Sequence, residues 1–168
     1  MARPWEKKGF HACATCHTAH AVKKPSTALL AGDGALCARC HKPESKGMLA
    51  AGAMKAELDG TTAAYESAEA AIGSAEEKGM DMADARDSLS AAKMAMYQAH
   101  TAVHSFDPGT VAKTAGESKS AAAKALEAAR AAVQDFRNRR LGLGLSTFVI
   151  AFLAGALYLK LRDYESGE

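Results

Sequence analysis

Two Cys-x-x-Cys-His motifs near the N-terminus constrain this chain more than any other feature. They read CATCH at residues 13–17 and CARCH at residues 37–41, and together they contain all four cysteines of the 168-residue chain. An exported domain with an even number of cysteines can be stapled by disulfides. Disulfides give no reason for a histidine to follow both pairs, so the motifs indicate a cofactor or metal site instead.

The motifs have the chemistry of covalent haem attachment. Two thiols at this spacing can add to the two vinyl groups of one haem, while the adjacent histidine is directed at its iron. We therefore expect two covalently bound haem c groups. Their predicted attachment residues are Cys13, Cys16 and His17 for the first and Cys37, Cys40 and His41 for the second.

A structural zinc ribbon is the main alternative for the cysteines. Two Cys-x-x-Cys pairs at this separation also suit a four-cysteine zinc site. Such a site needs no histidine after either pair. It also leaves four further histidines unexplained, which are His11, His20, His100 and His104.

The stretch FHACATCHTAHAVKKPSTALLAGDGALCARCHK, residues 10–42, resembles the doubled-CxxCH module of multihaem c-type cytochromes. In that family a histidine before the first motif, a CHxxH run, a Leu-Leu pair and an LCxxCH run recur in this order. The resemblance implies closely spaced haems with two histidines on each iron, used for electron transfer in extracytoplasmic respiratory chains. The matching residues are Phe10, His11, Cys13, Cys16, His17, His20, Leu29, Leu30, Leu36, Cys37, Cys40 and His41.

Two such haems need two distal ligands, and four histidines are available for them. His100 and His104 are four residues apart, so in a helix they share a face. His20 resembles the CHxxH histidine of the family, which usually reaches the neighbouring haem. We expect His20 and His104 to be the distal ligands, with His11 and His100 as alternates.

Methionine can replace histidine as the sixth ligand of a haem iron. Met80, Met82, Met94 and Met96 are candidates by position only. In an Ala-rich bundle, methionine more often fills the core.

The chain after residue 47 is dominated by alanine, which has the highest helix propensity. We expect one helix from about Met48 to Gly79, weakened near Gly60. Asp81 is a plausible N-cap for a second helix that runs to about Ser105 and packs on the first as an antiparallel hairpin. A third helix should begin at residues 107–108, because an aspartate can cap free N–H groups and a following proline loses no hydrogen bond.

Residues 141–161, LGLGLSTFVIAFLAGALYLKL, are apolar except for Lys160. In a helix this stretch is about 31 Å long, enough to cross a hydrocarbon core of about 30 Å. The sequence therefore predicts a transmembrane helix that continues the third helix. Its glycine and alanine residues permit close contact with another membrane helix, although such residues are common in membrane spans.

The expected fold is mainly α. It has a loop-rich dihaem module at residues 1–47, called the N-terminal module below, packed on a long antiparallel helical hairpin or bundle at residues 48–140. A transmembrane helix at 141–161 and a short tail at 162–168 follow.

The expected function is electron transfer by a membrane-anchored dihaem cytochrome, between a membrane quinol-linked respiratory complex and other cytochromes. We expect membrane subunits of such a complex and the lipid bilayer as partners. The net charge of +2 demands no nucleic acid, and no hydrolase triad, phosphate loop or HExxH motif suggests independent catalysis. The alternatives are a haem enzyme with one open iron site that reduces a small oxyanion or peroxide, and a structural zinc-ribbon membrane subunit.

Covalent haem attachment to CxxCH occurs outside the cytoplasmic membrane, so we expect a single-pass protein with its haem domain on the periplasmic side. Arg137, Arg139 and Arg140 precede the apolar segment, and only Lys160 and Arg162 lie near its other end. The positive-inside rule alone favours the opposite orientation, but large domains translocate largely regardless of charge. The start MARPWEKKG has no apolar leader core, so export needs a leader outside this numbering or another route.

Overall fold

The computed structural model describes residues 13–18, 20–21 and 25–166. Three long helices dominate it: α2 (Lys46–Glu76), α3 (Ala83–Ala102) and α4 (Pro108–Ser166). The short elements are α1 (Cys13–His17), η2 (Thr27–Leu29) and η3 (Cys37–Arg39), all before α2, and η4 (Val103–Ser105) after α3. The described residues contain no strand. The prediction of a mainly α chain with a loop-rich N-terminal region is confirmed.

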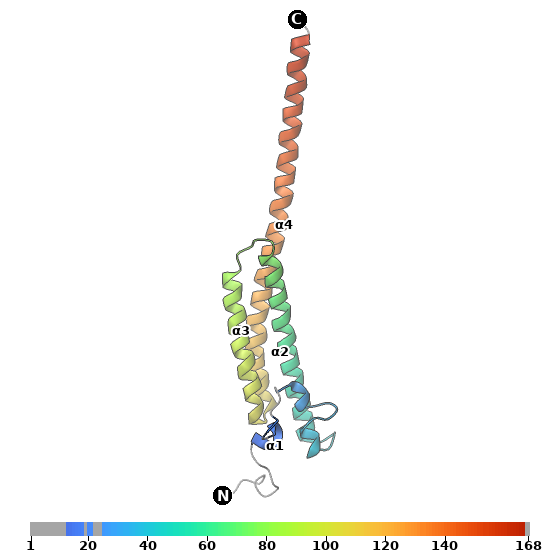
Figure 1. Cartoon of the computed structure of the whole chain (residues 1–168), viewed down its shortest axis with the longest axis vertical. Coiled ribbons are helices and arrows are strands. Elements are labelled where there is room, and N and C mark those ends of the chain that lie inside the picture. The colour runs from blue at the N-terminus through green and yellow to red at the C-terminus, as the bar shows by residue number, and fades with distance from the viewer. Residues whose placement is uncertain (1–12, 19, 22–24, 167–168) are drawn as a thin grey trace.

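The helices α2, α3 and the first part of α4 form an antiparallel bundle, from which the rest of α4 projects alone (Figure 1). Helix α4 packs on both of the others more extensively than α2 and α3 pack on each other. The predicted hairpin of two helices is therefore part of a three-helix bundle. Its helices meet through small side chains that recur every three or four residues, as one face of a helix requires; in α4 these are Val111, Ala115, Ser118, Ala122, Ala125 and Ala129.

Two apolar clusters fill the bundle. One surrounds Ile72 near the turn between α2 and α3, and the other surrounds Leu58 and Val111 near the N-terminal module. The buried hydroxyl of Ser118 donates a hydrogen bond of 2.7 Å to the carbonyl of Ala92, so this polar group is satisfied within the core. The largest fully buried apolar side chains are Leu58, Ile72 and Val111.

Helix α2 continues through Gly60, where the sequence predicts a weak point. The Lys119 side chain crosses from α4 at this level: its Nζ would lie 3.9 Å from a Cβ added at Gly60, and it pairs with Glu57. Contacts with α4 therefore outweigh the low helix propensity of one glycine. The helix begins at Lys46 and ends at Glu76, slightly earlier at both ends than predicted.

The start of α3 differs from the prediction by one residue. Met82 is in the N-cap position, and Asp81 instead accepts a hydrogen bond of 3.0 Å from the N–H of Ala83 through Oδ1. At its other end α3 stops at Ala102 and continues as the tighter turn η4 as far as Ser105. At the start of α3, the Asp81 carboxylate still satisfies a free N–H group of the helix, as an N-cap would.

Asp107 begins α4 as the sequence predicts. Its Oδ1 accepts from the N–H of Gly109 at 3.2 Å, and its Oδ2 accepts from the N–H of Thr110 at 2.9 Å. The hydroxyl of Thr110 donates to the same Oδ2 at 2.6 Å. These hydrogen bonds, with that of the Thr110 side chain as the largest cause, hold the pKa of Asp107 below its usual value.

Helix α4 runs without a break from the bundle into the apolar segment, as expected. Every residue from Arg137 to Ser166 is exposed, including the large apolar side chains Leu145, Phe148 and Ile150. Among the residues described, α4 is the one helix long and apolar enough, by length and composition, to cross a membrane.

The N-terminal module has almost no core of its own. Ala35, at 2% exposure, is the one buried residue in the part of the module that the structure describes. The module rests on the bundle through Leu30, which packs against the cluster around Leu58. The hydroxyl of Thr27 also donates a 2.6 Å hydrogen bond to Asp59 Oδ1 on α2.

Candidate cofactor-binding site

The first motif is a single helical turn, α1. Residues three apart in such a turn lie on the same side, so the thiols of Cys13 and Cys16 can reach one cofactor. Cys13 is exposed, whereas Cys16 and His17 are half-buried.

The second motif forms the 3-10 turn η3. The N–H groups of Cys40 and His41 both donate to the carbonyl of Cys37, at 3.2 and 3.0 Å. Because residues i and i+3 eclipse in a 3-10 helix, the two thiols of this motif also share a side. Each motif thus presents a pair of thiols that can bind to one group.

The thiols of the two motifs influence one another. Burial is the largest cause that raises the pKa of the Cys37 thiol, and the neighbouring Cys16 and Cys40 thiols raise it further. Such an effect of Cys16 requires proximity, because the interaction between charges weakens with distance. Two groups attached to these thiols would therefore be neighbours.

The histidine of the first motif lies close to His104 of η4, the turn that follows α3. The ring centres of His17 and His104 are 6.2 Å apart, with an angle of 37° between the ring planes. Bonds from a histidine nitrogen to a metal are about 2 Å long, so two rings at this distance could hold one metal ion between them if their free nitrogens point toward each other. His17 and His104 would then be able to bind the same iron.

The hydrogen bond of His104 identifies its free nitrogen. Its Nδ1 lies 2.9 Å from the carbonyl oxygen of Thr101. A carbonyl oxygen only accepts, so Nδ1 carries the proton and Nε2 keeps its lone pair. Metal-binding histidines usually donate their other N–H to a carbonyl or carboxylate in this way. His104 is therefore in the tautomer suited to ligation through Nε2.

His41 of the second motif lies against the first turn of α2. A Cβ added at Gly47 would come within 2.8 Å of three atoms of the imidazole ring. The ring is thus backed by the helix, while the residue as a whole is exposed.

The remaining histidines differ in position. His100, one turn before His104, is half-buried, and its charge contributes to lowering the pKa of Asp59. The main causes of that lowered pKa are hydrogen bonds from Lys55 and then Thr27. Because Thr27 belongs to the module and Asp59 to α2, Asp59 marks the contact between module and bundle, and His100 lies near it. His20 is exposed, and the predicted alternate His11 is outside the described residues.

Two of the four methionines that are candidates by position lie at the α2–α3 turn. Met80 and Met82 pack on the cluster around Ile72, at the end of the bundle away from the motifs (Figure 1). They fill the core, as the sequence favours for methionine in an Ala-rich bundle.

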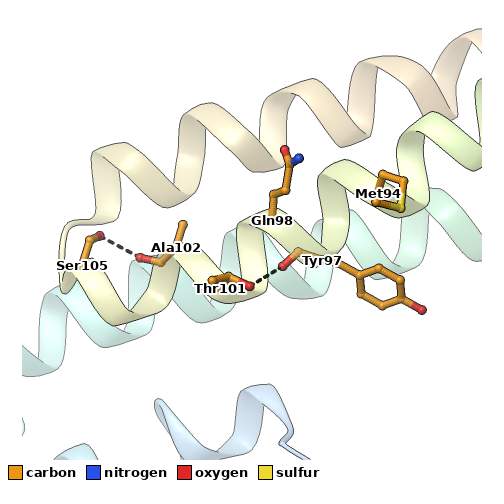
Figure 2. A pocket seen from close by; sticks show the side chains of 6 residues that line it. All are labelled: Met94, Tyr97, Gln98, Thr101, Ala102 and Ser105. Carbon is orange, nitrogen blue, oxygen red and sulfur yellow. Dashed lines mark hydrogen bonds between the residues drawn. The ribbon is translucent and has the colours of Figure 1, made fainter.

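Sequence reasoning missed a shallow groove of about 440 Å³ on the outer surface of α3 (Figure 2). Met94 and Tyr97 are more than half exposed in it. The groove reaches the haem end of the helix through Thr101, whose carbonyl accepts from His104. Two apolar side chains three residues apart on a helix were the available signal. The lining residues are Met94, Tyr97, Gln98, Thr101, Ala102 and Ser105.

Four thiols that converge on one zinc ion would form a compact cluster. Within the part of the chain that the structure describes, no three His, Cys, Asp or Glu residues are grouped to hold a metal ion. The geometry instead shows two thiol pairs, each followed by its own histidine.

Comparison with known families agrees with this geometry. Residues 4–46 match the doubled CXXCH motif family, a multihaem cytochrome c motif. The doubled motif, with its four cysteines, implies two covalently bound haem c groups. No curated protein and no solved structure matches the chain.

Proposed function

Starting from the doubled CXXCH motif at residues 4–46, we propose that this chain is a membrane-anchored dihaem cytochrome c. It passes electrons between a membrane quinol-linked respiratory complex and other cytochromes, as a subunit of a larger assembly. When bound, the haems supply one-electron chemistry. The chain supplies attachment, axial ligands and spacing.

The pairing of His17 with His104 at 6.2 Å carries the proposal. If both histidines bound the same haem iron, no position on that iron would remain open to a substrate. Such a site exchanges electrons rather than binding a small oxyanion or peroxide. In this assignment His17 is the proximal ligand and His104 the distal ligand of the first haem.

The second haem is attached through Cys37 and Cys40 with His41 as proximal ligand. Its distal ligand is His20 in this proposal, with His11 and His100 as the alternates. The doubled motif within residues 4–46 supports two haems close enough to exchange electrons directly.

Helix α4 anchors the chain in this proposal. Its exposed apolar part crosses the cytoplasmic membrane once and carries the haem end of the bundle on the periplasmic side, where covalent haem attachment occurs. The support is the length and composition of the helix and the exposure of every residue from Arg137 to Ser166. Loss of the chain from the membrane fraction after truncation at Arg140 tests the anchor.

Replacement of His104 tests the electron-transfer assignment. The purified wild-type protein should show two low-spin c-type haems per chain that bind no carbon monoxide. His104→Ala should convert one of the two to a high-spin form that binds carbon monoxide, because it removes one axial ligand. Optical spectra of the oxidised and dithionite-reduced protein, with a pyridine haemochrome assay, measure both properties.

His100→Ala is the matched control, because His100 lies in the last turn of α3, four residues before His104 in η4. It should leave the haem bound to the first motif low-spin. Carbon monoxide binding by the wild-type protein would instead identify an open iron site and contradict the electron-carrier proposal. A low-spin spectrum in His104→Ala would contradict the ligand assignment.

A further inference from the structure

We propose that Gly47, in the first turn of α2, is a positioning residue that holds the imidazole of His41 in place for the second haem. This inference rests on the proposed dihaem function. Gly47 lies outside both motifs, and the placement of the imidazole that would bind the second iron depends on it.

The space at Gly47 is occupied by the imidazole ring. A Cβ added there would lie 2.4 Å from Nδ1, 2.6 Å from Cε1 and 2.8 Å from Cγ of His41. Carbon atoms of side chains essentially never approach other heavy atoms so closely. Only glycine therefore lets the ring rest directly on the backbone of the helix.

The turn between the motif and α2 brings the two residues together. The N–H and the hydroxyl of Ser45 both donate to the carbonyl of Lys42, at 3.0 and 2.7 Å. The same hydroxyl oxygen accepts from the N–H of Met48 at 3.4 Å and caps α2. The chain thus folds back immediately after His41, and the first turn of α2 forms a wall behind its ring.

Backbone conformation gives no other reason for glycine at this position. The glycines with positive φ are Gly32, Gly34 and Gly79 among the described residues, so Gly47 has an ordinary helical conformation. Glycine is a poor helix former compared with alanine. The contact with His41 is the feature of the described structure that a side chain at this position would disturb.

The other glycines of α2 serve as internal comparisons. A Cβ at Gly52 or Gly73 would meet nothing within 4 Å, and one at Gly60 would make only an ordinary contact with Lys119 at 3.9 Å. An alanine at Gly47 therefore displaces a ring, whereas an alanine at Gly52 displaces nothing. Because the atoms displaced belong to the end of the His41 side chain, the helix itself can keep its course.

The first experiment compares Gly47→Ala with Gly52→Ala in the full-length haem-loaded protein. Both variants should keep two covalent haems per chain by the pyridine haemochrome assay, since all four thiols remain. In Gly47→Ala one of the two low-spin electron paramagnetic resonance signals should shift or be replaced by a high-spin signal. Gly52→Ala should retain both signals of the wild-type protein.

Unchanged signals in Gly47→Ala would overturn the inference while leaving the dihaem function intact. The wild-type spectrum separates the two ideas: a wild-type protein without two low-spin c-type haems contradicts the proposed function itself. The two failures therefore have different signatures.

A double-mutant cycle keeps the test decisive if Gly47→Ala loses its second haem or unfolds more easily. Gly47→Ala is made in the wild-type chain and in His41→Ala, and the thermal midpoint and haem content are measured for all four proteins. The loss of stability or haem that Gly47→Ala causes should disappear when the imidazole is absent, which leaves only the small gain from the higher helix propensity of alanine. An equal effect in both backgrounds would show that Gly47 acts independently of His41 and overturn the inference.

Discussion

The three-helix bundle is stabilised by its own side chains, whereas the segments attached to its two ends are not. In the bundle Leu58 and Ile72 are 1% and 0% exposed. In the described part of the N-terminal module only Ala35 is buried, and along α4 every residue from Arg137 to Ser166 is exposed. The two ends therefore depend on what they bind.

The bundle therefore provides the stability of the chain, whereas its two ends carry the residues proposed to bind haem and membrane. An Ala-rich core lets helix axes approach closely and needs no partner. The module has thiols and imidazoles in place of a core, so covalent haems would supply the buried apolar surface that it lacks. The projecting part of α4 exposes large apolar side chains, which a bilayer would cover. Three variants test whether these regions are independent.

Removal of one thiol pair should have the largest effect. Cys13→Ala combined with Cys16→Ala should lower covalent haem from two to one per chain, because each motif attaches one haem. The helical circular dichroism signal should stay, since the bundle buries its own core. Haemochrome and circular dichroism assays measure the two effects, with Ala14→Ser as the control inside the same motif. Loss of helicity would show that the bundle depends on the haems.

Truncation after Arg140 should release the chain from the membrane. The exposed apolar segment is removed, while the thermal midpoint of the bundle should stay the same because those residues pack on no described part of it. Membrane fractionation and circular dichroism melting measure the two results. A chain that lacks only residues 162–168 is the control and should remain in the membrane. Retention of the truncated chain would indicate another attachment.

Two core substitutions should have a smaller effect. They show which of the two apolar clusters supports the N-terminal module. Leu58→Ala and Ile72→Ala should each lower the free energy of unfolding by about 2–5 kcal/mol, measured by denaturant titration. Leu58 belongs to the cluster on which Leu30 of the module packs, and Ile72 does not. Leu58→Ala should therefore also perturb the haem spectrum, with Ile72→Ala as the internal control. A spectral change in Ile72→Ala alone would contradict this docking contact.

Much of the site was predictable because its signals are local. The thiol pairs with their histidines and the capping Asp107 each act within a few residues. The unbroken course of α2 through Gly60 was not predictable, since contacts from Lys119 on another helix outweigh the local propensity. Nor does periodicity place Met80 and Met82 at the end of the bundle away from the motifs.

By itself the sequence determined the two haem-attachment motifs, the helical character of the Ala-rich region and the apolar segment after Arg140, because spacing, propensity and composition act along the chain. Only the tertiary structure decided that His104 lies close to His17, and that Gly47 backs His41. Both contacts depend on where the module docks on the bundle. That docking joins residues far apart in sequence, and no local pattern records it.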